Sequence, residues 1–256
     1  MNKQPVIFED LGIVNYKSAW DYQEELVKKN VDIKTEARKN NEKFTSNEIS
    51  FLNKTLPTVN RLLFCEHPPV YTLGKSGHME NVLLSEDEME EKEIEFFKTN
   101  RGGDITFHGL QQVVGYPILD LEKFYTDIGK YLRSLEEVII LTIAEYGIKG
   151  ERSKGETGVW IDAGILGKER KICAMGIRCS RWITMHGFAL NVNTDLSYFN
   201  NIIPCGIINK QVTSVEREVG HTIDFEEIKE KIKKNFEQVF DVEITSPNIH
   251  LHQVQA

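Results

Sequence analysis

Apolar and polar residues follow two different periods along this chain, and each period predicts a different kind of element. Residues 18–40 and 126–148 are rich in helix formers, and the second of these segments is predicted to end near Gly147. Over residues 225–240, apolar side chains recur at helical spacing and lysines occupy the other positions. We therefore expect three amphipathic helices, each with one face packed on a core.

Shorter apolar runs predict strands between these helices. The runs cover residues 59–65, 112–121, 157–162, 171–180 and 182–193. Pro117 lies inside the second run and suggests an edge strand or a bulge, because proline has no N–H to donate to a neighbouring strand. Ser85 and Glu88 have the spacing of a helix capping box, and the acidic residues after them are typical of a solvated helix face.

The order of these segments predicts one α/β (α+β) domain with a mixed β-sheet flanked by helices. No linker rich in proline, glycine or serine divides the chain, and no internal repeat is present. We expect residues 1–245 to form this domain and residues 246–256 to form a C-terminal tail.

Composition agrees with a globular protein and excludes several function classes. Apolar residues make up 40% and charged residues 27% of 256 residues, and the formal net charge is −8. This charge argues against a surface that binds nucleic acid or anionic lipid non-specifically. The longest apolar run, Val138–Ala144, is too short to cross a membrane, and Glu9 and Asp10 stand where a signal peptide needs apolar residues. We expect a cytoplasmic protein.

The four cysteines, at positions 65, 173, 179 and 205, form no CxxC motif and have no zinc-site partners. They are best interpreted as reduced thiols, of which at most one is reactive, and no metal site is expected. Cys205 lies between Pro204 and Gly206, in the stretch "IIPCGI". Such a cysteine is either a buried thiol at an ordinary turn or a nucleophile at the mouth of a pocket.

Two further stretches carry candidate chemistry. In "RGGDITFHG" (101–109), two glycines let the backbone approach a ligand closely, and polar Thr106 and His108 alternate with apolar neighbours. A plain Gly-Gly turn before a strand explains the same spacing equally well. In the second stretch, Lys171 begins an otherwise apolar strand, and on its own it is best explained as an exposed lysine at a strand end.

Taken together, these stretches resemble the lipoyl(octanoyl) transferases, which move an octanoyl group from acyl carrier protein onto a lysine of lipoyl domains. The similarity rests on "RGGDITFHG…QVVGYPILDL", "GVW…KICAMGIR…W…MHGFALNVN.DL..F..IIPCGI" and "VTSV", in order and at similar spacing, from about Phe8 to Ile244. It implies the fold of the biotin/lipoate protein ligases and an ATP-independent acyltransferase of the EC 2.3.1 class. It also implies a place in lipoate biosynthesis and protein lipoylation.

The resemblance also implies roles for individual residues. The acyl-thioester cysteine corresponds to Cys205, and the lysine that lowers its pKa corresponds to Lys171. The implied acyl-binding residues are Arg101, Gly102, Gly103, Asp104, Ile105, Thr106, Phe107, His108, Ala174, Met175, Gly176, Gly187, Phe188 and Ala189. The chain departs from the family at Leu110 and Gln111, where Pro and Gly are usual. If the second of these positions requires a positive φ, Gln111 is strained there by roughly 1 kcal/mol or more.

The implied partners are octanoyl-acyl carrier protein as donor and an acceptor lipoyl domain, either of a 2-oxoacid dehydrogenase complex or of the glycine cleavage H protein. No cofactor, nucleic acid or membrane partner is expected. The run Lys149–Arg181 carries a net charge of +4, which predicts one basic face for acidic partners.

Three alternatives stay open: a lipoyl-domain amidotransferase, an ATP-dependent lipoate or biotin protein ligase, and a non-catalytic acyl-binding protein. Gly74-Lys75-Ser76 ends like a nucleotide-binding P-loop, but Pro69 stands where the motif needs its first glycine. An adenylate-forming ligase needs a nucleotide site and no catalytic cysteine, so the stretch around Cys205 argues against it.

Overall fold

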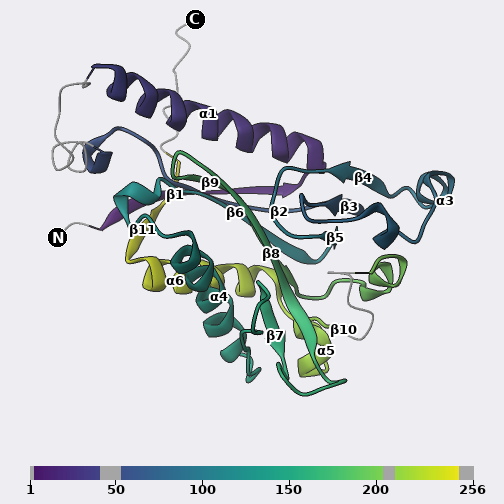
Figure 1. Cartoon of the computed structure of the whole chain (residues 1–256). Helices are drawn as coiled ribbons and strands as arrows, with labels where there is room; N and C mark the ends of the chain where they lie inside the picture. The colour runs from purple at the N-terminus through teal and green to yellow at the C-terminus, as the bar shows by residue number, and fades with distance from the viewer. Residues whose placement is uncertain (1–2, 41–52, 204–210, 248–256) are drawn as a thin grey trace, which may run out of the picture.

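A computed structural model describes residues 3–40, 53–203 and 211–247, and its centre is an eight-stranded mixed sheet (Figure 1). The strand order is β10-β8-β9-β6-β2-β1-β11, with β7 paired to β8 outside this path. β1 runs parallel to β2 and β11, and β10 runs parallel to β8, whereas the other pairs are antiparallel. The strands are β1 (Gln4–Ile13), β2 (Arg61–Glu66), β6 (Gln112–Ile118), β7 (Val159–Ile161), β8 (Arg170–Ser180), β9 (Ile183–Asn191), β10 (Gln211–Val212) and β11 (Val242–Thr245).

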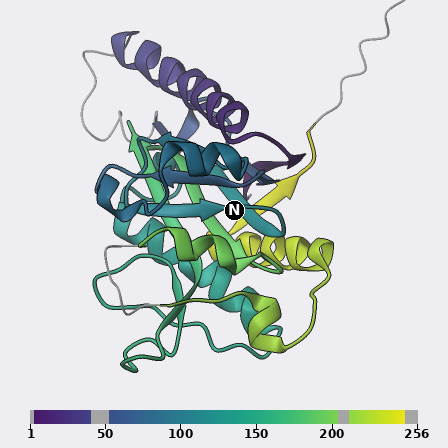
Figure 2. The same cartoon turned by 90° about the vertical axis from the view of Figure 1, so that its right-hand side faces the viewer.

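Helices cover both faces of this sheet. Figures 1 and 2 place α1 (Tyr16–Asn40) above it and α6 (Phe225–Phe240) below it, and α4 (Ile128–Ala144) packs beside α6. Alternate residues of β2 divide between these layers: Leu63 and Cys65 pack in the cluster under α1, and Leu62 and Phe64 pack against α4 and α6. This division follows from the two-residue period of a strand.

A three-stranded sheet, ordered β4-β3-β5, has a core of its own. Its strands are β4 (Glu95–Lys98), β3 (Val70–Leu73) and β5 (Ile105–His108). Ile105 and Phe107 point into this core with residues of the short elements around it, and Thr106 and His108 face the opposite side. α3 (Glu86–Glu91) and η3 (Leu196–Asn201) contribute to this core. The remaining short elements of the chain are η1 (Met79–Asn81), η2 (Leu121–Lys123) and α5 (Val215–Val219).

Most elements expected from the sequence are confirmed. Each of the three predicted helices and each predicted strand run has its counterpart, and the capping box of Ser85 and Glu88 is present at the start of α3. The expectation that Pro117 marks an edge strand is wrong, because β6 lies between β2 and β9. The continuous β6–β9 pairing ends at Gly115, and the hydroxyl of Thr184 donates to the carbonyl of Pro117 at 2.8 Å. Because the ladder with β9 is interrupted locally, the missing N–H of Pro117 is not needed there, and a central strand can contain this proline.

No helix in the described part of the chain combines the length and the apolar composition that crossing a membrane requires.

Candidate active site

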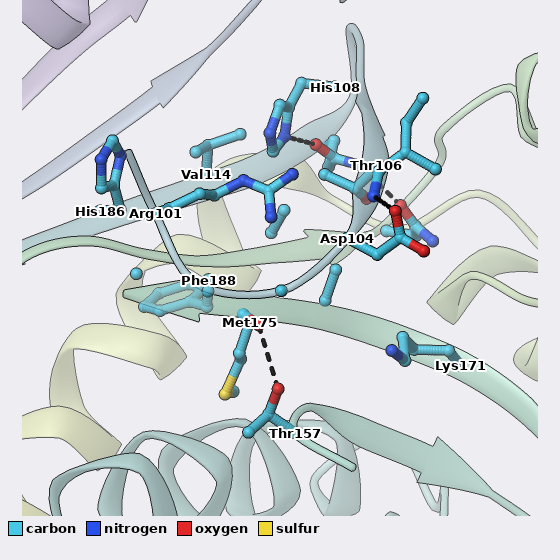
Figure 3. Close-up of a pocket in the computed structure, with 18 of the residues that line it drawn as sticks. Arg101, Asp104, Thr106, His108, Val114, Thr157, Lys171, Met175, His186 and Phe188 are labelled. Carbon is cyan, nitrogen blue, oxygen red and sulfur yellow. Dashed lines mark hydrogen bonds between the residues drawn. The ribbon is translucent and has the colours of Figure 1, made fainter. Parts of the chain in front are cut away.

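A cavity of about 90 Å³ opens between the large sheet and the segment that leads into β5 (Figure 3). β6, β8 and β9 supply its floor, and Tyr16 of α1 contributes from above. Three segments far apart in the sequence therefore meet here: the stretch around Arg101–His108, the start of β8 and the end of β9. These are the same segments that the sequence analysis assigned to one site.

Most predicted site residues line this cavity. They are Arg101, Gly103, Asp104, Ile105, Thr106, His108, Lys171, Ala174, Met175, Gly176, Gly187, Phe188 and Ala189. Gly102 and Phe107 do not line it: the Gly102 N–H donates to the carbonyl of Ile177 at 2.9 Å, and Phe107 stacks on Tyr198 in the core of the small sheet. Cys205 lies outside the described residues.

The register of β8 and β9 explains why two of the predicted segments share the floor. Ala174 pairs with Ala189 and Gly176 pairs with Gly187. A Cβ at Gly176 would lie 2.6 Å from the carbonyl oxygen of Gly102, too close for any other residue without movement of the backbone. Glycine at this position therefore lets the Arg101–Asp104 loop close onto β8.

The stretch "TLGKSGH" (72–78) holds the other side of the Arg101–Asp104 loop. The N–H groups of Gly74, Lys75 and Ser76 donate to the carbonyls of Asp104, Arg101 and Gly103, at 3.2, 2.9 and 3.1 Å. Because these three N–H groups are used within the protein, this stretch braces the cavity wall. Lys75 itself is exposed and does not line the cavity.

A chain of hydrogen bonds crosses the cavity from Arg101 to β9. The Arg101 guanidinium donates to Thr72 Oγ1 at 2.9 Å, and the Thr72 hydroxyl then faces Nε2 of His108 at 3.3 Å. His108 Nδ1 lies 2.9 Å from Gln112 Oε1, and Gln112 Nε2 donates to Asn191 Oδ1 at 2.8 Å. Gln112 Nε2 donates to two oxygens, so its Oε1 is the atom that faces His108. Because an amide oxygen can only accept, Nδ1 of His108 carries the proton and Nε2 accepts from the Thr72 hydroxyl.

This chain reaches the strand that carries Lys171. The Asn191 amide donates to the carbonyl of Thr213 at 3.0 Å, and the Thr213 N–H donates to the carbonyl of Lys171 at 2.9 Å. Thr72, Gln112, Asn191 and Tyr16 were not predicted as site residues. Gln112 and Asn191 are polar residues at the ends of buried apolar strands, which is a signal that the sequence did contain.

Three buried histidines surround this region, and burial lowers the pKa of each. The pKa of His67 falls to about 4 and that of His186 to about 3; for His186, the charges of Arg101 and Arg178 add to desolvation. The pKa of His108 is held well below its usual value by burial first, and the charge of Arg101 adds to this effect. All three imidazoles are therefore neutral at neutral pH.

Lys171 lies at one end of the cavity and His186 with Arg101 at the other, as Figure 3 shows. In β8, Lys171 pairs with Trp160 of β7 on one side and with Val212 of β10 on the other. Its Nζ atom lies 4.5 Å from the centre of the Trp160 ring. The interpretation of Lys171 as a plain exposed strand-end residue is wrong, because the side chain is partly buried and lines the cavity.

The three described cysteines have the environment of unreactive thiols. Cys65 and Cys173 are buried, and desolvation raises the pKa of each thiol far above its usual value. Cys179 is partly exposed, and its pKa is also raised by desolvation. A thiolate is the reactive form, so these three positions resist alkylation in the folded protein.

The run Lys149–Arg181 does not form the single basic face that its net charge predicted. Lys149 pairs with Glu151, Arg152 with Glu136, and Arg170 with Asp162 and Glu218. Arg178 lies on the other side of the sheet, where it pairs with Glu24 of α1. Acids from outside the run therefore pair with three of its eight basic residues, Arg152, Arg170 and Arg178.

Comparison with known proteins agrees with this geometry. Residues 15–237 match the family model described as the lipoyl protein ligase A/B catalytic domain. An octanoyltransferase of Christiangramia forsetii is 56% identical over 245 residues, which are 95% of this chain and 99% of the relative. An octanoyltransferase of Flavobacterium johnsoniae is 57% identical over 95% of this chain and 100% of the relative.

Solved structures show the same fold at low sequence identity. A bipartite lipoate protein ligase from Thermoplasma acidophilum superposes with a TM-score of 0.65 at 14% identity, over 96% of this chain and 86% of that one. A lipoate-protein ligase A bound with ATP gives a TM-score of 0.63 at 13% identity, over 96% and 88%. The chain therefore belongs to the lipoyl protein ligase A/B catalytic domain family and, within it, to the octanoyltransferases.

Proposed function

We propose that this protein transfers an octanoyl group, or a lipoyl group, from acyl carrier protein to a lysine of a lipoyl domain, and that Cys205 carries the group as a thioester. The observation that supports this most directly is the cavity, which brings Lys171 together with the segments of β5, β8 and β9. The proposed donor is octanoyl-acyl carrier protein. The proposed acceptors are lipoyl domains of 2-oxoacid dehydrogenase complexes or the glycine cleavage H protein, and the proposed location is the cytoplasm.

The dimensions of the cavity fit an acyl chain of medium length. The floor runs along β8 from Lys171 to Gly176, and these five residue-to-residue steps rise about 16 Å at roughly 3.3 Å each. Ala174, Val114 and Ala189 provide an apolar surface for such a chain.

The proposed reaction has two steps. The Cys205 thiolate attacks the carbonyl carbon of the donor thioester, a new carbon–sulfur bond forms, and the carrier thiolate leaves and takes up a proton. The acceptor lysine, as a neutral amine, then attacks the acyl-enzyme; an amide forms, the Cys205 thiolate leaves, and one proton is released. The first step exchanges one thioester for another and the second runs downhill, so neither requires ATP.

Lys171 has a proposed role in both steps. Its ammonium stabilises the Cys205 thiolate before acylation. After acylation the thiolate is gone, and Lys171 can give up its proton and then take one from the attacking lysine. One side chain thus serves as counter-ion first and as general base second.

Mass spectrometry after mixing the protein with octanoyl-acyl carrier protein, without ATP, tests this proposal. We expect the mass of one octanoyl group on the wild type and on Cys173→Ala, and none on Cys205→Ala. Addition of unmodified lipoyl domain should discharge the label onto that domain. An octanoyl adduct that forms only with free octanoate and ATP would identify a ligase instead, and one that forms only from an octanoylated lipoyl domain would identify an amidotransferase.

A further inference from the structure

Trp160 is a buried aromatic residue beside the candidate site that the proposed reaction does not use. It is 2% exposed and lies in β7, directly opposite Lys171 of β8. Its backbone is fixed by two reciprocal hydrogen bonds with Glu151, of 2.8 and 2.9 Å. The backbone of Trp160 is therefore held by pairing on both sides of the strand.

The strand that carries Trp160 is anchored at its other end as well. The N–H of Gly158 donates to the buried carboxylate of Glu136 at 3.1 Å, and Glu136 in turn pairs with Arg133 and Arg152. Gly158 has a φ of +107°, and a Cβ there would contact the carbonyl of Cys173 and lie 3.7 Å from Cε of Lys171. The approach of β7 to the Lys171 stem thus depends on this glycine.

The face of the Trp160 ring points at the Lys171 ammonium. Nζ lies 4.5 Å from the ring centre, within the range of about 6 Å in which a cation is attracted by the negative face of an indole. This attraction grows when the pair is removed from water, and Lys171 is partly buried at the cavity end. The ring therefore restricts the position of Nζ.

Charged groups on the neighbouring elements are already paired with other residues. Arg170, the neighbour of Lys171 in β8, pairs with Asp162 and Glu218. The Glu136 carboxylate on α4 is shared by two arginines, and Asp104 in the cavity wall accepts hydrogen bonds from the Asn81 amide and the Ile105 N–H. Cys173, also in β8, is a neutral thiol.

We infer that Trp160 is a positioning residue for acyl transfer: its ring holds the Lys171 ammonium at the mouth of the acyl cavity, where it acts as the counter-ion of the nucleophile. This inference rests on the proposed function, because it assigns Trp160 an effect that reaches the reaction only through Lys171. It predicts that loss of the ring weakens the thiolate-stabilising effect of Lys171 even though the lysine remains.

The pH midpoint of Cys205 alkylation by iodoacetamide tests this role in the full-length protein. Trp160→Leu should raise the midpoint, by no more than the shift that Lys171→Met causes, because Trp160 acts only through the lysine. Trp160→Phe and Trp160→Tyr keep a ring and should raise it less. If Trp160→Leu does not fold, the two aromatic variants decide, because phenylalanine and tyrosine attract a cation less strongly than tryptophan. A raised midpoint in either variant supports the role, and an unchanged midpoint in both overturns it.

A double-mutant comparison shows whether Trp160 acts through the charge of Lys171 or only on the structure of the site. In a Lys171→Met background, Trp160→Leu should cause no further shift, because the cation is absent. An equal shift in that background would show that Trp160 acts only on the structure of the site and would overturn the inference. If Lys171→Met alone leaves the midpoint unchanged, the Lys171–Cys205 pairing itself is wrong; if Lys171→Met shifts it and no Trp160 variant does, the inference alone fails.

Tyr125→Leu is a matched control. The ring of Tyr125 faces Lys130 Nζ at 4.4 Å, a contact of similar geometry on α4 away from the cavity. Its loss should leave the alkylation midpoint of Cys205 unchanged. A shift as large as that of Trp160→Leu would mean that loss of any such contact perturbs the thiol, and would overturn the specific role of Trp160.

Discussion

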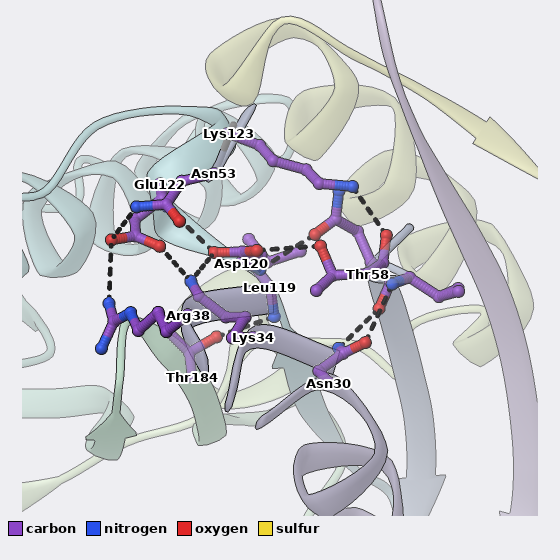
Figure 4. A network of polar contacts seen from close by, with 12 residues as sticks. Asn30, Lys34, Arg38, Asn53, Thr58, Leu119, Asp120, Glu122, Lys123 and Thr184 are labelled. Carbon is purple, nitrogen blue, oxygen red and sulfur yellow. Dashed lines mark hydrogen bonds and ion pairs between the residues drawn. The ribbon is translucent and has the colours of Figure 1, made fainter. Parts of the chain in front are cut away.

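Lys34 Nζ lies 2.6 Å from Asp120 Oδ1, and both side chains are fully buried (Figure 4). Glu122 completes the ion cluster, and Thr58 donates its hydroxyl to the second oxygen of Asp120 at 2.8 Å. The pair joins the C-terminal half of α1 to the end of β6 across 86 positions of sequence. It therefore fixes the helix whose first residue, Tyr16, lines the cavity.

Breaking this pair from one side should destabilise the fold strongly. Lys34→Met leaves the Asp120 carboxylate buried without its cation, and we expect a loss of about 3–5 kcal/mol in the free energy of unfolding. Urea denaturation measures this loss. Lys29→Met, which removes an exposed pair with Glu25 on the same helix, should leave the unfolding midpoint almost unchanged. Equal effects of the two substitutions would contradict a structural role for the buried pair.

Gln111 adopts the left-handed conformation, with a φ of +60°, at the position where the family usually has glycine. Its N–H donates to Glu66 at 2.6 Å, and its side-chain oxygen accepts from the Asn193 amide at 2.8 Å. The structure thus confirms that this position requires a positive φ. The two hydrogen bonds offset part of the strain of a side chain there.

Substitutions at Gln111 should follow backbone preference. Gln111→Gly relieves strain of about 1–2 kcal/mol. It also loses a hydrogen bond and adds freedom to the unfolded chain, so its stability should stay within about 1 kcal/mol of the wild type. Gln111→Val keeps the strain in a β-branched residue and should cost about 2 kcal/mol or more. Thermal or urea unfolding compares the two, and equal stability of Val and Gly would show that this backbone relaxes freely.

The buried histidines predict loss of stability in acid. His67, His108 and His186 stay neutral in the folded protein, whereas each takes up a proton near pH 6.5 when unfolded. Between pH 6.5 and about 4 the unfolded state thus binds more protons, and stability falls as pH falls, by up to about 1.4 kcal/mol per pH unit for each histidine. Urea unfolding at several pH values measures this slope.

A substitution identifies the contribution of one of these histidines. His67→Gln removes one titrating group while glutamine can still donate to the Val14 carbonyl and accept from the Tyr116 hydroxyl. Between pH 6 and 5, the free energy of unfolding of this variant should fall less steeply with falling pH, by the amount that corresponds to about one bound proton. His221→Gln, at an exposed position, should keep the slope of the wild type. An unchanged slope in His67→Gln would mean that His67 is protonated in the folded state.

The cavity floor should set the preferred acyl length at Ala174. This residue is partly open to the cavity and pairs with Ala189, whereas Met175 packs mainly in the core against α4 and α6. Ala174→Leu adds three carbons to the floor, and each methylene that no longer fits costs about 0.8 kcal/mol of binding. The preferred acyl chain of the donor should therefore shorten from eight carbons to about five or six. The values of kcat/KM for a series of acyl-carrier proteins that differ in acyl length measure this change.

Cys173→Ala is the control for this change, because its side chain lies on the core side of the same strand. It should lower stability and keep the order of preference among donors. Retention of the eight-carbon optimum by Ala174→Leu would remove Ala174 from the acyl-binding surface.

The three long helices and the strands β2, β6, β7, β8 and β9 could be predicted from the sequence because their signals are local, whereas β1, β3, β4 and β11 were missed. The helical spacing of Phe225, Ile228 and Ile232 reports which face of α6 is buried, and the Ser85–Glu88 box depends on four consecutive residues. The segments around Arg101 and Lys171, which line the cavity, could also be found, because their motifs are long. None of these inferences needed the partner of any strand.

Only the tertiary structure decided which residues meet. The pairing of β7 with β8 sets Trp160 against Lys171, and the packing of α1 on β6 sets Lys34 against Asp120. Pro117 is compatible with a central strand because the β6–β9 ladder is interrupted after Gly115. Three arginines of the basic run pair with acids from α1, α4 and α5. Register and ion pairing depend on residues tens of positions apart, and local periodicity carries no information about them.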